Sequence, residues 1–540
     1  MSLWEQVYLP FNNIWLSAIV AAIPIIFFLV LLVVFKLKGY VAGGLSVLVA
    51  GIVALFVYKM PVTMVVASAG YGVLAGLWPV VSIVLAAIFL YEITVHTGQF
   101  TIIKNSISSV TDDQRIQVLL VAFSFGAFLE GAAGFGVPVA ITAAILVGLG
   151  FRPLYAAGLC LIANIAGGGF GAMGIPVTAP AILTNLSPLT VGRDAALVLP
   201  LMSLVVAFVL IFIIDGIKGI RQTFPAILVS GGSFALTQFV VLYFLGAELA
   251  DILASVVSLF ALILFLRKWK PKEIYKMSEA KENSSSVKET YSAGKIVYAW
   301  TPFILLTAFV TLFNLSFIKN LFAPGGPLEK LVFSFPIPGL NNLVIRHTPV
   351  VPKSVPYAAV FKLDLFSSTT TAIVLAIIFT LIIFRCNWKI IKETAIKTVK
   401  ELVAPILTIC SVLAFAYVCT YSGMSSTLGL ALASTGKIFP LFSPILGWLG
   451  VFLTGSVVNS GSLFAPLQSV TAAQIGISPE SMVAVNVMGG TMAKMISPQS
   501  VAVAAAAVGL VGKENELFKF TIKYSLGFLV LIGIISWLIF

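Results

Sequence analysis

The sequence predicts an all-α polytopic membrane protein, and three observations carry that prediction. Hydrophobic residues make up 60% of the 540 residues and charged residues only 10%, and apolar runs long enough to cross a bilayer recur along the chain. Segment 123–180 holds a glutamate and two glycine clusters inside apolar sequence, which interrupts any continuous helix. Near the C-terminus NVMGGTMAKMISP (486–498) repeats NIAGGGFGAMGIP (164–176). Two halves that each carry an interrupted segment are typical of inverted-repeat secondary transporters.

Charge and cysteine placement exclude several other classes. The formal charge of +12 comes from basic residues between apolar runs, where the positive-inside rule places them. We therefore expect this chain to lie in a lipid bilayer and not to bind nucleic acid. The four cysteines are scattered without a metal-ligand or disulfide spacing. The acidic start MSLWEQVYLP does not resemble a signal peptide.

The first membrane half is predicted over 1–245. Its ordinary crossings are expected at 14–35, 40–58, 77–95, 195–214 and 224–245. Segment 116–150 is broken by EGAAGFGVP, and we expect a re-entrant hairpin there because glycines permit a tight turn and Pro138 suits the first turn of a half-helix. Segment 155–187 is expected to be a broken helix, interrupted at GGGFGAMGIP.

An extra span and a basic linker, 246–295, separate the halves, and the second half is predicted over 296–540. The linker part, 267–295, carries eight basic residues and is expected in the cytoplasm, with the N-terminus outside. In the second half we expect crossings, an outer loop, a basic interfacial helix, a hairpin and a broken helix. These elements are expected at 296–313, 319–362, 366–384, 385–401, 405–421, 439–475 (turn at 459–466), 482–510 and 520–540. Lysine placement makes the two hairpins enter from opposite faces, with about eleven crossings in all.

The breaks predict an anion site near the middle of the bilayer. A broken span survives only where it is buried in protein or lines a cavity. Half-helix N-termini offer free N–H donors and partial positive charge, and Pro176 and Pro498 fall where such half-helices would begin, with Ser497 as a natural N-cap. The best-matched ligand is a small carboxylate. The alternative is that the glycines only let helices pack closely.

Three ionisable residues lie well inside apolar spans: Glu92, Glu130 and Lys494. Such residues are costly in lipid and mark functional sites. Burial favours the protonated form of a carboxyl group, so Glu130 is expected to carry the coupled proton. Lys494 is expected to pair either with the substrate carboxylate or with Glu130. Glu92 and His96, four residues apart, favour an interfacial pair over a proton relay.

The candidate substrate-binding residues are the cation, the polar residues and the glycines at the breaks. They are Lys494, Asn164, Asn486, Gly134, Gly136, Gly168, Gly490, Ser460, Ser462 and Ser497. The matched asparagines have helix-to-helix hydrogen bonding as their alternative. Walker A, HExxH and GxSxG motifs are absent from the sequence, so we expect a carrier rather than an enzyme, with no metal and no cofactor besides a co-transported proton.

The motifs FLEGAAGFGVPVAI, IANIAGGGFGAMGIPVT and SGSLFAP resemble those of the bacterial lactate permease family, which also includes glycolate permeases. The resemblance covers nearly the whole chain. It implies uptake of L-lactate, D-lactate and glycolate across the bacterial cell membrane by proton symport. The residues alone leave two rivals open: a sodium-coupled carboxylate carrier, with Thr178 near its ion site, and an anion channel. The oligomeric state also stays open, a homo-oligomer included.

Overall fold

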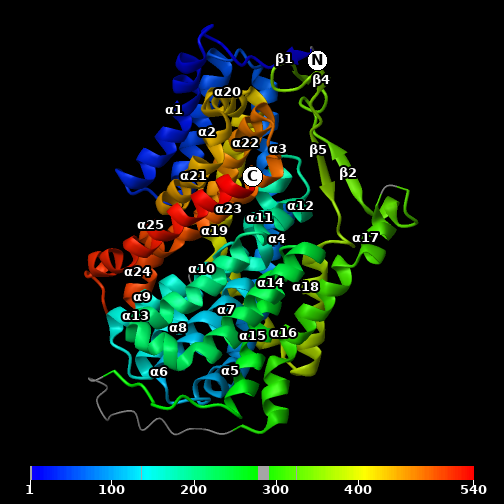
Figure 1. The fold of residues 1–540 in the computed structure, drawn as a ribbon. Coiled ribbons are helices and arrows are strands. Elements are labelled where there is room, and N and C mark those ends of the chain that lie inside the picture. The colour runs from blue at the N-terminus through cyan, green and yellow to red at the C-terminus, as the bar shows by residue number, and fades with distance from the viewer. Residues whose placement is uncertain (1–2, 135–136, 278–290, 324) are drawn as a thin grey trace.

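The computed structural model describes residues 3–134, 137–277, 291–323 and 325–540. The molecule is an elongated, largely helical body (Figure 1), with the N-terminus and α20 at one end and α5 and α6 at the other. Within the described part, nine helices are long and apolar enough to cross a membrane, or ten if the one bent helix pair counts as a span. These helices do not correspond one to one with the roughly eleven predicted crossings, because the 46-residue helix Leu199–Phe244 covers two of them and the apolar helices at 250–266 and 369–383 are shorter than the roughly 20 residues that a crossing needs.

The first segment of the chain forms a helical hairpin and one long bent span. Its elements are α1 (Ile14–Val33), α2 (Gly39–Phe56), α3 (Val62–Ala75), the π-helical η1 (Gly76–Val81) and α4 (Ser82–His96). The predicted crossing 77–95 begins beside a kink, and α3 precedes it within an apolar helical segment of 35 residues, 62–96. Trp78 leaves helical geometry inside this span (φ −133°, ψ 126°), as expected for a residue before proline.

The predicted hairpin region folds back so that its two ends meet. Its elements are α5 (Gln99–Ser108), α6 (Gln114–Gln117), η2 (Val118–Phe125), α7 (Gly126–Ala132) and α8 (Val137–Gly148). The Gln114 side-chain amide donates to the Leu149 carbonyl oxygen at 3.3 Å, which joins the start of the segment to its end. Gly136 lies outside the described residues. That segment 116–150 enters and leaves the bilayer on the same side stays a prediction.

The first broken helix lies between Pro153 and Leu183. It consists of α9 (Pro153–Ala163), α10 (Ile165–Gly168) and α11 (Gly171–Leu183), with a bend of 51°. Ala172, Met173 and Gly174 all have positive φ (46°, 63° and 73°) at the start of α11. A left-handed run with two non-glycine residues costs free energy, so the surrounding packing holds this break open.

Helices α12 to α15 complete the first half and the extra span. They are α12 (Pro188–Ala196), α13 (Leu199–Ile227), η3 (Leu228–Gly232), α14 (Ser233–Phe244) and α15 (Ala250–Leu266). The predicted crossings 195–214 and 224–245 are joined by the continuation of α13, which bends where Asp215 and Gly216 leave helical geometry.

Residues 293–422 form four α-helices and, together with β1 near the N-terminus, a small group of paired strands, here called the β cap. Its helices are α16 (Ala293–Asn314), α17 (Ser316–Phe322), α18 (Thr369–Ile383) and α19 (Trp388–Ser422). Its strands pair β1 (Trp4–Glu5) with β3 (Val344–Arg346), β3 with β4 (Val355–Pro356), and β2 (Phe333–Pro336) with β5 (Val360–Leu363). The segment predicted as an outer loop, 319–362, thus contains four short strands within an otherwise helical fold. The prediction of a separate interfacial helix at 385–401 is wrong, because α19 runs without a break through Pro405 and joins that segment to the predicted crossing 405–421.

The C-terminal segment contains the second helix pair and the second broken helix. Its elements are α20 (Met424–Leu432), η5 (Ala433–Ile438), α21 (Phe439–Thr454), α22 (Val457–Ile475), α23 (Pro479–Ala493), η6 (Lys494–Ile496), α24 (Pro498–Ala507) and α25 (Glu514–Ile539). The turn predicted at 459–466 is misplaced. The chain turns at Gly455, which has a φ of 71°, and the Ser456 side chain caps the next helix by accepting from Asn459 N.

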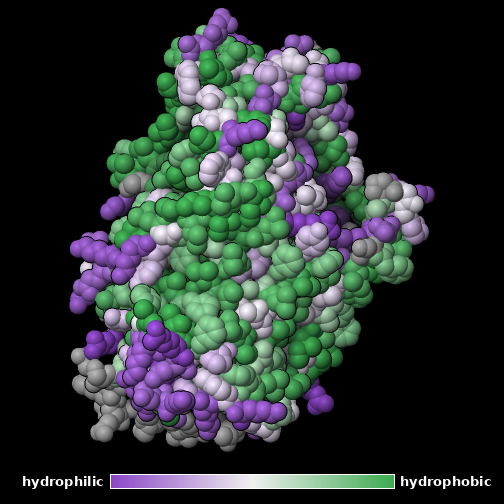
Figure 2. All heavy atoms as spheres, viewed as in Figure 1, coloured by the Kyte–Doolittle hydropathy of each residue, from purple (hydrophilic) through white to green (hydrophobic). Residues whose placement is uncertain are grey.

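The packing of these helices suits a membrane protein. Figure 2 shows a wide hydrophobic area across the middle of the displayed face, with hydrophilic residues gathered toward both ends. Inside the body, α21 and α23 approach so closely that a methyl group at Gly489 would clash with the Pro444 carbonyl, and one at Gly447 with Asn486. The close-packing role that the sequence left open therefore applies to these glycines.

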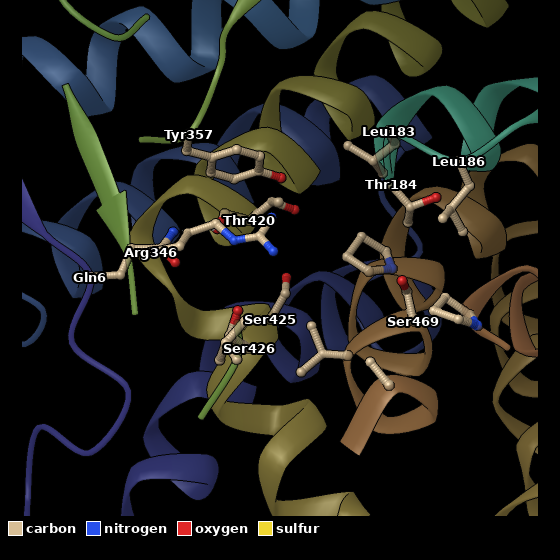
Figure 3. Close-up of a pocket in the computed structure, with 15 residues that line it drawn as sticks. Gln6, Leu183, Thr184, Leu186, Arg346, Tyr357, Thr420, Ser425, Ser426 and Ser469 are labelled. Carbon is tan, nitrogen blue, oxygen red and sulfur yellow. Dashed lines mark hydrogen bonds between the residues drawn. The ribbon is translucent and has the colours of Figure 1, made fainter. Parts of the chain in front are cut away.

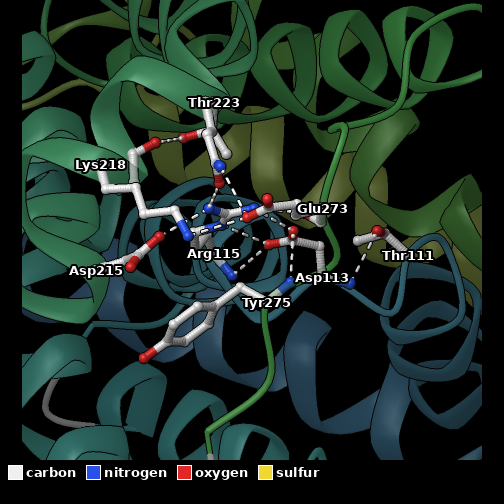
Figure 4. Close-up of polar contacts among 10 residues, drawn as sticks. Thr111, Asp113, Arg115, Asp215, Lys218, Thr223, Glu273 and Tyr275 are labelled. Carbon is white, nitrogen blue, oxygen red and sulfur yellow. Dashed lines mark hydrogen bonds and ion pairs between the residues drawn. The ribbon is translucent and has the colours of Figure 1, made fainter.

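An ion-pair cluster joins α6, α13 and the linker at the end of the molecule (Figure 4). The Arg115 side chain is buried and pairs with Asp113 at 2.7 Å and with Asp215 at 2.8 Å. Arg115 also donates to the Gln222 side chain and to the Glu273 carbonyl oxygen. Asp113 is a neighbour in the sequence, whereas Asp215, Gln222 and Glu273 come from distant segments, so this one guanidinium ties α6 to α13 and to the linker.

Replacing Arg115 by methionine is expected to destabilise the folded protein by about 3 to 5 kcal/mol, because the buried carboxylate of Asp113 and the partly buried carboxylate of Asp215 (16% exposed) lose their partner. Lys218→Met is the matched control: its pair with Glu273 is exposed at both side chains (67% and 64%), and exposed pairs contribute about 1 kcal/mol or less. Thermal unfolding of the two purified variants measures the difference. Equal destabilisation would contradict a structural role for the buried cluster.

Candidate functional site

Three helix N-termini converge on one cavity of about 80 Å³ in the middle of the molecule. The start of α11 contributes Gly171, Ala172 and Pro176; the start of α22 contributes Ser456, Val457 and Val458; and the start of α24 contributes Gln499, Ser500 and Val503. Each helix N-terminus carries partial positive charge and unpaired N–H groups. The cavity is therefore a favourable place for an anion, with room for several water molecules.

A buried ion pair lines the same cavity. The Lys494 ammonium group donates to Oε1 of Glu130, and the Asn164 side-chain amide donates to Oε2 at 2.9 Å. Glu130 is 1% exposed and the Lys494 side chain 12%. The structure thus brings together three predicted residues, and the pair joins α7 of the first half to η6 of the second.

A second buried carboxyl group, Asp251, lies behind this pair. A methyl group added at Gly131 would lie 2.9 Å from Asp251 Cβ. One added at Gly167 would lie 3.0 Å from Asp251 Oδ2 and 3.3 Å from Glu130 Cβ, so Gly167 lies between the two carboxyl groups. Asp251 is 1% exposed, and its Oδ2 has no hydrogen-bond partner among the described residues. Its other oxygen accepts from the Gln238 amide at 3.3 Å. A buried oxygen without a partner is costly in either protonation state, and the cost is far larger when the carboxyl group is ionised.

Sequence reasoning missed Asp251 because the residue stands at the start of a predicted span, where carboxylates usually meet water. In the structure it begins α15 but faces α7 and α10. The signal that was available is an acidic residue between two apolar runs with no basic residue nearby, in LGAELADILA (245–254). That pattern lacks the cations that commonly anchor a span end.

Similarity to known proteins follows the same motifs. A sequence model described as L-lactate permease matches residues 17–540. The chain belongs to the L-lactate permease family. It is 52% identical to the L-lactate permease of Escherichia coli strain K12 over 539 residues, covering 99% of this chain and 98% of that protein. It is 50% identical to the glycolate permease GlcA of the same strain over 547 residues, with the same two shares covered.

Among solved structures, this L-lactate permease family member is similar to the YdaH transporter of Alcanivorax borkumensis. The TM-score is 0.45 and the identity 16%, over 88% of this chain and 87% of that chain. The sequence matches confirm the predicted family, and the long apolar helices of the described residues confirm the predicted helical membrane class. The inverted relation between the halves stays a prediction.

In this L-lactate permease family member, glycines let the helix breaks approach the ion pair. Gly168 lies against Lys494, with 3.2 Å from an added methyl group to Lys494 Cδ. A methyl group at Gly171 would clash with the Glu130 carboxylate. Gly134, with a φ of 63°, borders Ala172. Predicted residues Gly134 and Gly168 both line the cavity.

Gly171→Ala is expected to lower substrate uptake at least about tenfold, because the added methyl group displaces the Glu130 carboxylate from Lys494. The control is Gly148→Ala at the end of α8, where an added methyl group meets no atom within 4 Å. Uptake per amount of folded protein in membranes, with thermal unfolding measured in parallel, separates a site effect from misfolding. Equal uptake by the two variants would contradict this role of Gly171.

Several predicted site residues lie in helix packing instead of the cavity. Asn486 donates to Gln468 at 2.7 Å, Gly490 packs against Val451, and Ser460 donates to the Gly447 carbonyl oxygen. Two others form hydrogen bonds close to their own position: Ser462 with the Val458 carbonyl oxygen, and the N-cap Ser497 with Ser500. Of these five, Ser497 alone adjoins the site, through the first turn of α24.

The remaining intramembrane carboxylate, Glu92, is part of a different ion pair. Glu92 Oε2 accepts from Lys397 of α19 at 2.7 Å and lies 3.5 Å from Nδ1 of His96. The interaction joins α4 to α19 and supports the expected interfacial pair. It does not contact the cavity between α11, α22 and α24.

Proposed function

We propose that this permease carries L-lactate and related 2-hydroxy monocarboxylates, including D-lactate and glycolate, across the bacterial cell membrane in symport with protons. Family membership and relatives named L-lactate permease and glycolate permease support the substrate class. The cavity is small and surrounded by helix N-termini, which suits a small anion better than a bulky or cationic solute.

The observation that carries the mechanism is the Glu130–Lys494 pair at the cavity. A substrate carboxylate that enters competes with Glu130 for the Lys494 ammonium group. The N–H groups at the starts of α11, α22 and α24 favour the incoming anion. Once the substrate takes Lys494, the Glu130 carboxylate is buried with only Asn164 as a partner, and protonation removes the cost of that charge. Substrate and proton binding are coupled in this way.

Asp251 fits the same scheme as a second proton site. With Glu130 and Asp251 both ionised and Lys494 charged, the buried cluster would carry one net negative charge, and one proton on Asp251 makes it neutral. The carboxyl group of Asp251 is linked through Gln238 to Ser203, whose hydroxyl donates to Gln238 at 3.0 Å. Protonation of Asp251 would therefore remove the charge of a carboxyl group whose Oδ2 has no partner among the described residues.

Transport in proteoliposomes tests the proposal. Purified protein is expected to exchange radiolabelled L-lactate across the membrane in counterflow, and an inward lactate gradient is expected to acidify the lumen at a ratio of about one proton per lactate. Absence of lactate counterflow would overturn the substrate assignment. Uptake that follows a sodium gradient at fixed pH would favour the sodium-coupled carrier, and conductance without saturation would favour a channel.

A further inference from the structure

A second polar cavity, of about 220 Å³, lies between the β cap and the ends of α11, α20 and α22 (Figure 3). Hydroxyl and amide groups dominate its polar lining: Gln6, Thr184, Tyr357, Thr420, Ser425, Ser426 and Ser469. Arg346 of β3 is the one charged residue in this lining, and its guanidinium group points into the space between these side chains. The cavity therefore combines one cation with several hydroxyl groups.

The Arg346 guanidinium group is oriented but not neutralised. It lies 4.7 Å from the centre of the Tyr357 ring, which holds it by a cation–π contact. Its Nε is buried and has no hydrogen-bond partner among the described residues, and within the same residues no carboxylate lies within 4.0 Å of the group. A buried donor without an acceptor is costly. The geometry suits a carboxylate, which guanidinium groups bind through two parallel hydrogen bonds.

The two cavities lie along the same pair of helices. On α11 the central cavity reaches Pro176 and the second cavity begins at Leu183; on α22 the corresponding residues are Val458 and Pro466. Seven or eight residues of helix correspond to about 10 to 12 Å. Between the cavities Pro180 packs on Gly461, so tightly that a methyl group at Gly461 would lie 2.5 Å from Pro180 Cγ. This contact therefore lies between the parts of α11 and α22 that line the two cavities.

We propose that the Arg346 cavity is a second binding site for a small 2-hydroxy monocarboxylate, occupied before the Pro180–Gly461 contact opens toward Lys494. Arg346 binds the carboxylate, and the hydroxyl groups of Ser425 and Ser426 bind the substrate hydroxyl. The inference rests on the proposed substrate class. It differs from the central site in needing neither the Glu130–Lys494 pair nor a proton.

The test uses the full chain in lipid nanodiscs with the central site disabled by Glu130→Gln and Lys494→Met together. Titration calorimetry with L-lactate is expected to detect one remaining site, weakened at least about tenfold by adding Arg346→Gln and restored in part by Arg346→Lys. Arg221→Gln, at an exposed arginine of α13, is the matched charge control. Chloride titration distinguishes carboxylate binding from binding of any anion.

Kinetics give a second readout that does not depend on the double variant. With Glu130 and Lys494 intact, Arg346→Gln is expected to raise the KM for L-lactate uptake at least about tenfold with Vmax within about twofold. No remaining site in the double variant, equal binding with and without Arg346, displacement by chloride alone, or an unchanged KM would each overturn the inference. Lactate transport by the unmodified chain tests the proposed function separately, so the two failures are distinguishable.

Discussion

Lys494→Met is expected to abolish lactate uptake, with a loss of at least about 100-fold. The substitution removes the cavity-lining ammonium group, and a close buried charge pair contributes several kcal/mol, each 1.4 kcal/mol being about tenfold in binding. It also leaves Glu130 buried without its cation, which is expected to cost about 3 to 5 kcal/mol of stability at a pH where the group is ionised. Radiolabelled uptake and thermal unfolding measure the two effects.

The double variant Glu130→Gln with Lys494→Met separates these effects. Removing both charges leaves no unpaired buried ion, so its stability is expected to return to within about 1 to 2 kcal/mol of the unmodified protein. Its uptake is expected to stay abolished. Lys494→Met uptake above one tenth of the unmodified level would show that the ammonium group does not bind the substrate.

Glu130→Gln is expected to separate exchange from coupling. The glutamine has nearly the same shape and can still accept from Asn164, but it cannot carry a proton. Lactate counterflow is expected to continue, whereas uphill uptake driven by a proton gradient is expected to fall more than about tenfold. Lactate affinity at neutral pH is expected to rise, because Glu130 no longer competes for Lys494.

Glu92→Gln provides the matched control for this prediction, because it removes another intramembrane carboxylate that pairs with Lys397 and His96. It is expected to keep proton-driven uptake within about threefold of the unmodified protein. Uphill uptake by Glu130→Gln equal to that of the unmodified protein would remove Glu130 from the coupling mechanism.

Asp251→Asn tests the second proton site. It is expected to change the pH dependence of uptake without loss of lactate counterflow.

Local sequence patterns predicted the broken helices well and the surrounding elements less well. Glycine and proline specify where a helix can break, and both GGGFGAMGIP and KMISP fall at observed breaks. The turn of the second pair was misplaced because two signals compete: Gly455 with Ser456, and the glycine and proline of NSGSLFAP, which the structure accommodates inside α22. The β cap was missed because its strands of two to four residues carry almost no periodic signal.

Glu130 and Lys494 of the candidate site were predictable from the sequence, but which polar residues join them was not. A lone glutamate and a lone lysine inside apolar runs are unusual wherever they occur, so Glu130 and Lys494 could be selected from composition. Asn164 and Asn486 hold matching places in the repeat, yet one contacts Glu130 and the other Gln468. Repeat position does not decide which face of a helix meets a cavity.

The sequence by itself determined that this chain is a helical membrane protein of the L-lactate permease family, because hydrophobic runs, glycine breaks and family motifs are local properties of the chain. Only the tertiary structure decided that Glu130 and Lys494, 364 residues apart, are partners, that Asp251 lies behind them, and that Arg346 faces a separate cavity. Those relations depend on how helices from the two halves pack. In lipid, close packing and polar contacts between helices bring such distant residues together. The hydrophobic effect does not favour one helix pair over another there, because lipid tails are as apolar as the helix surfaces.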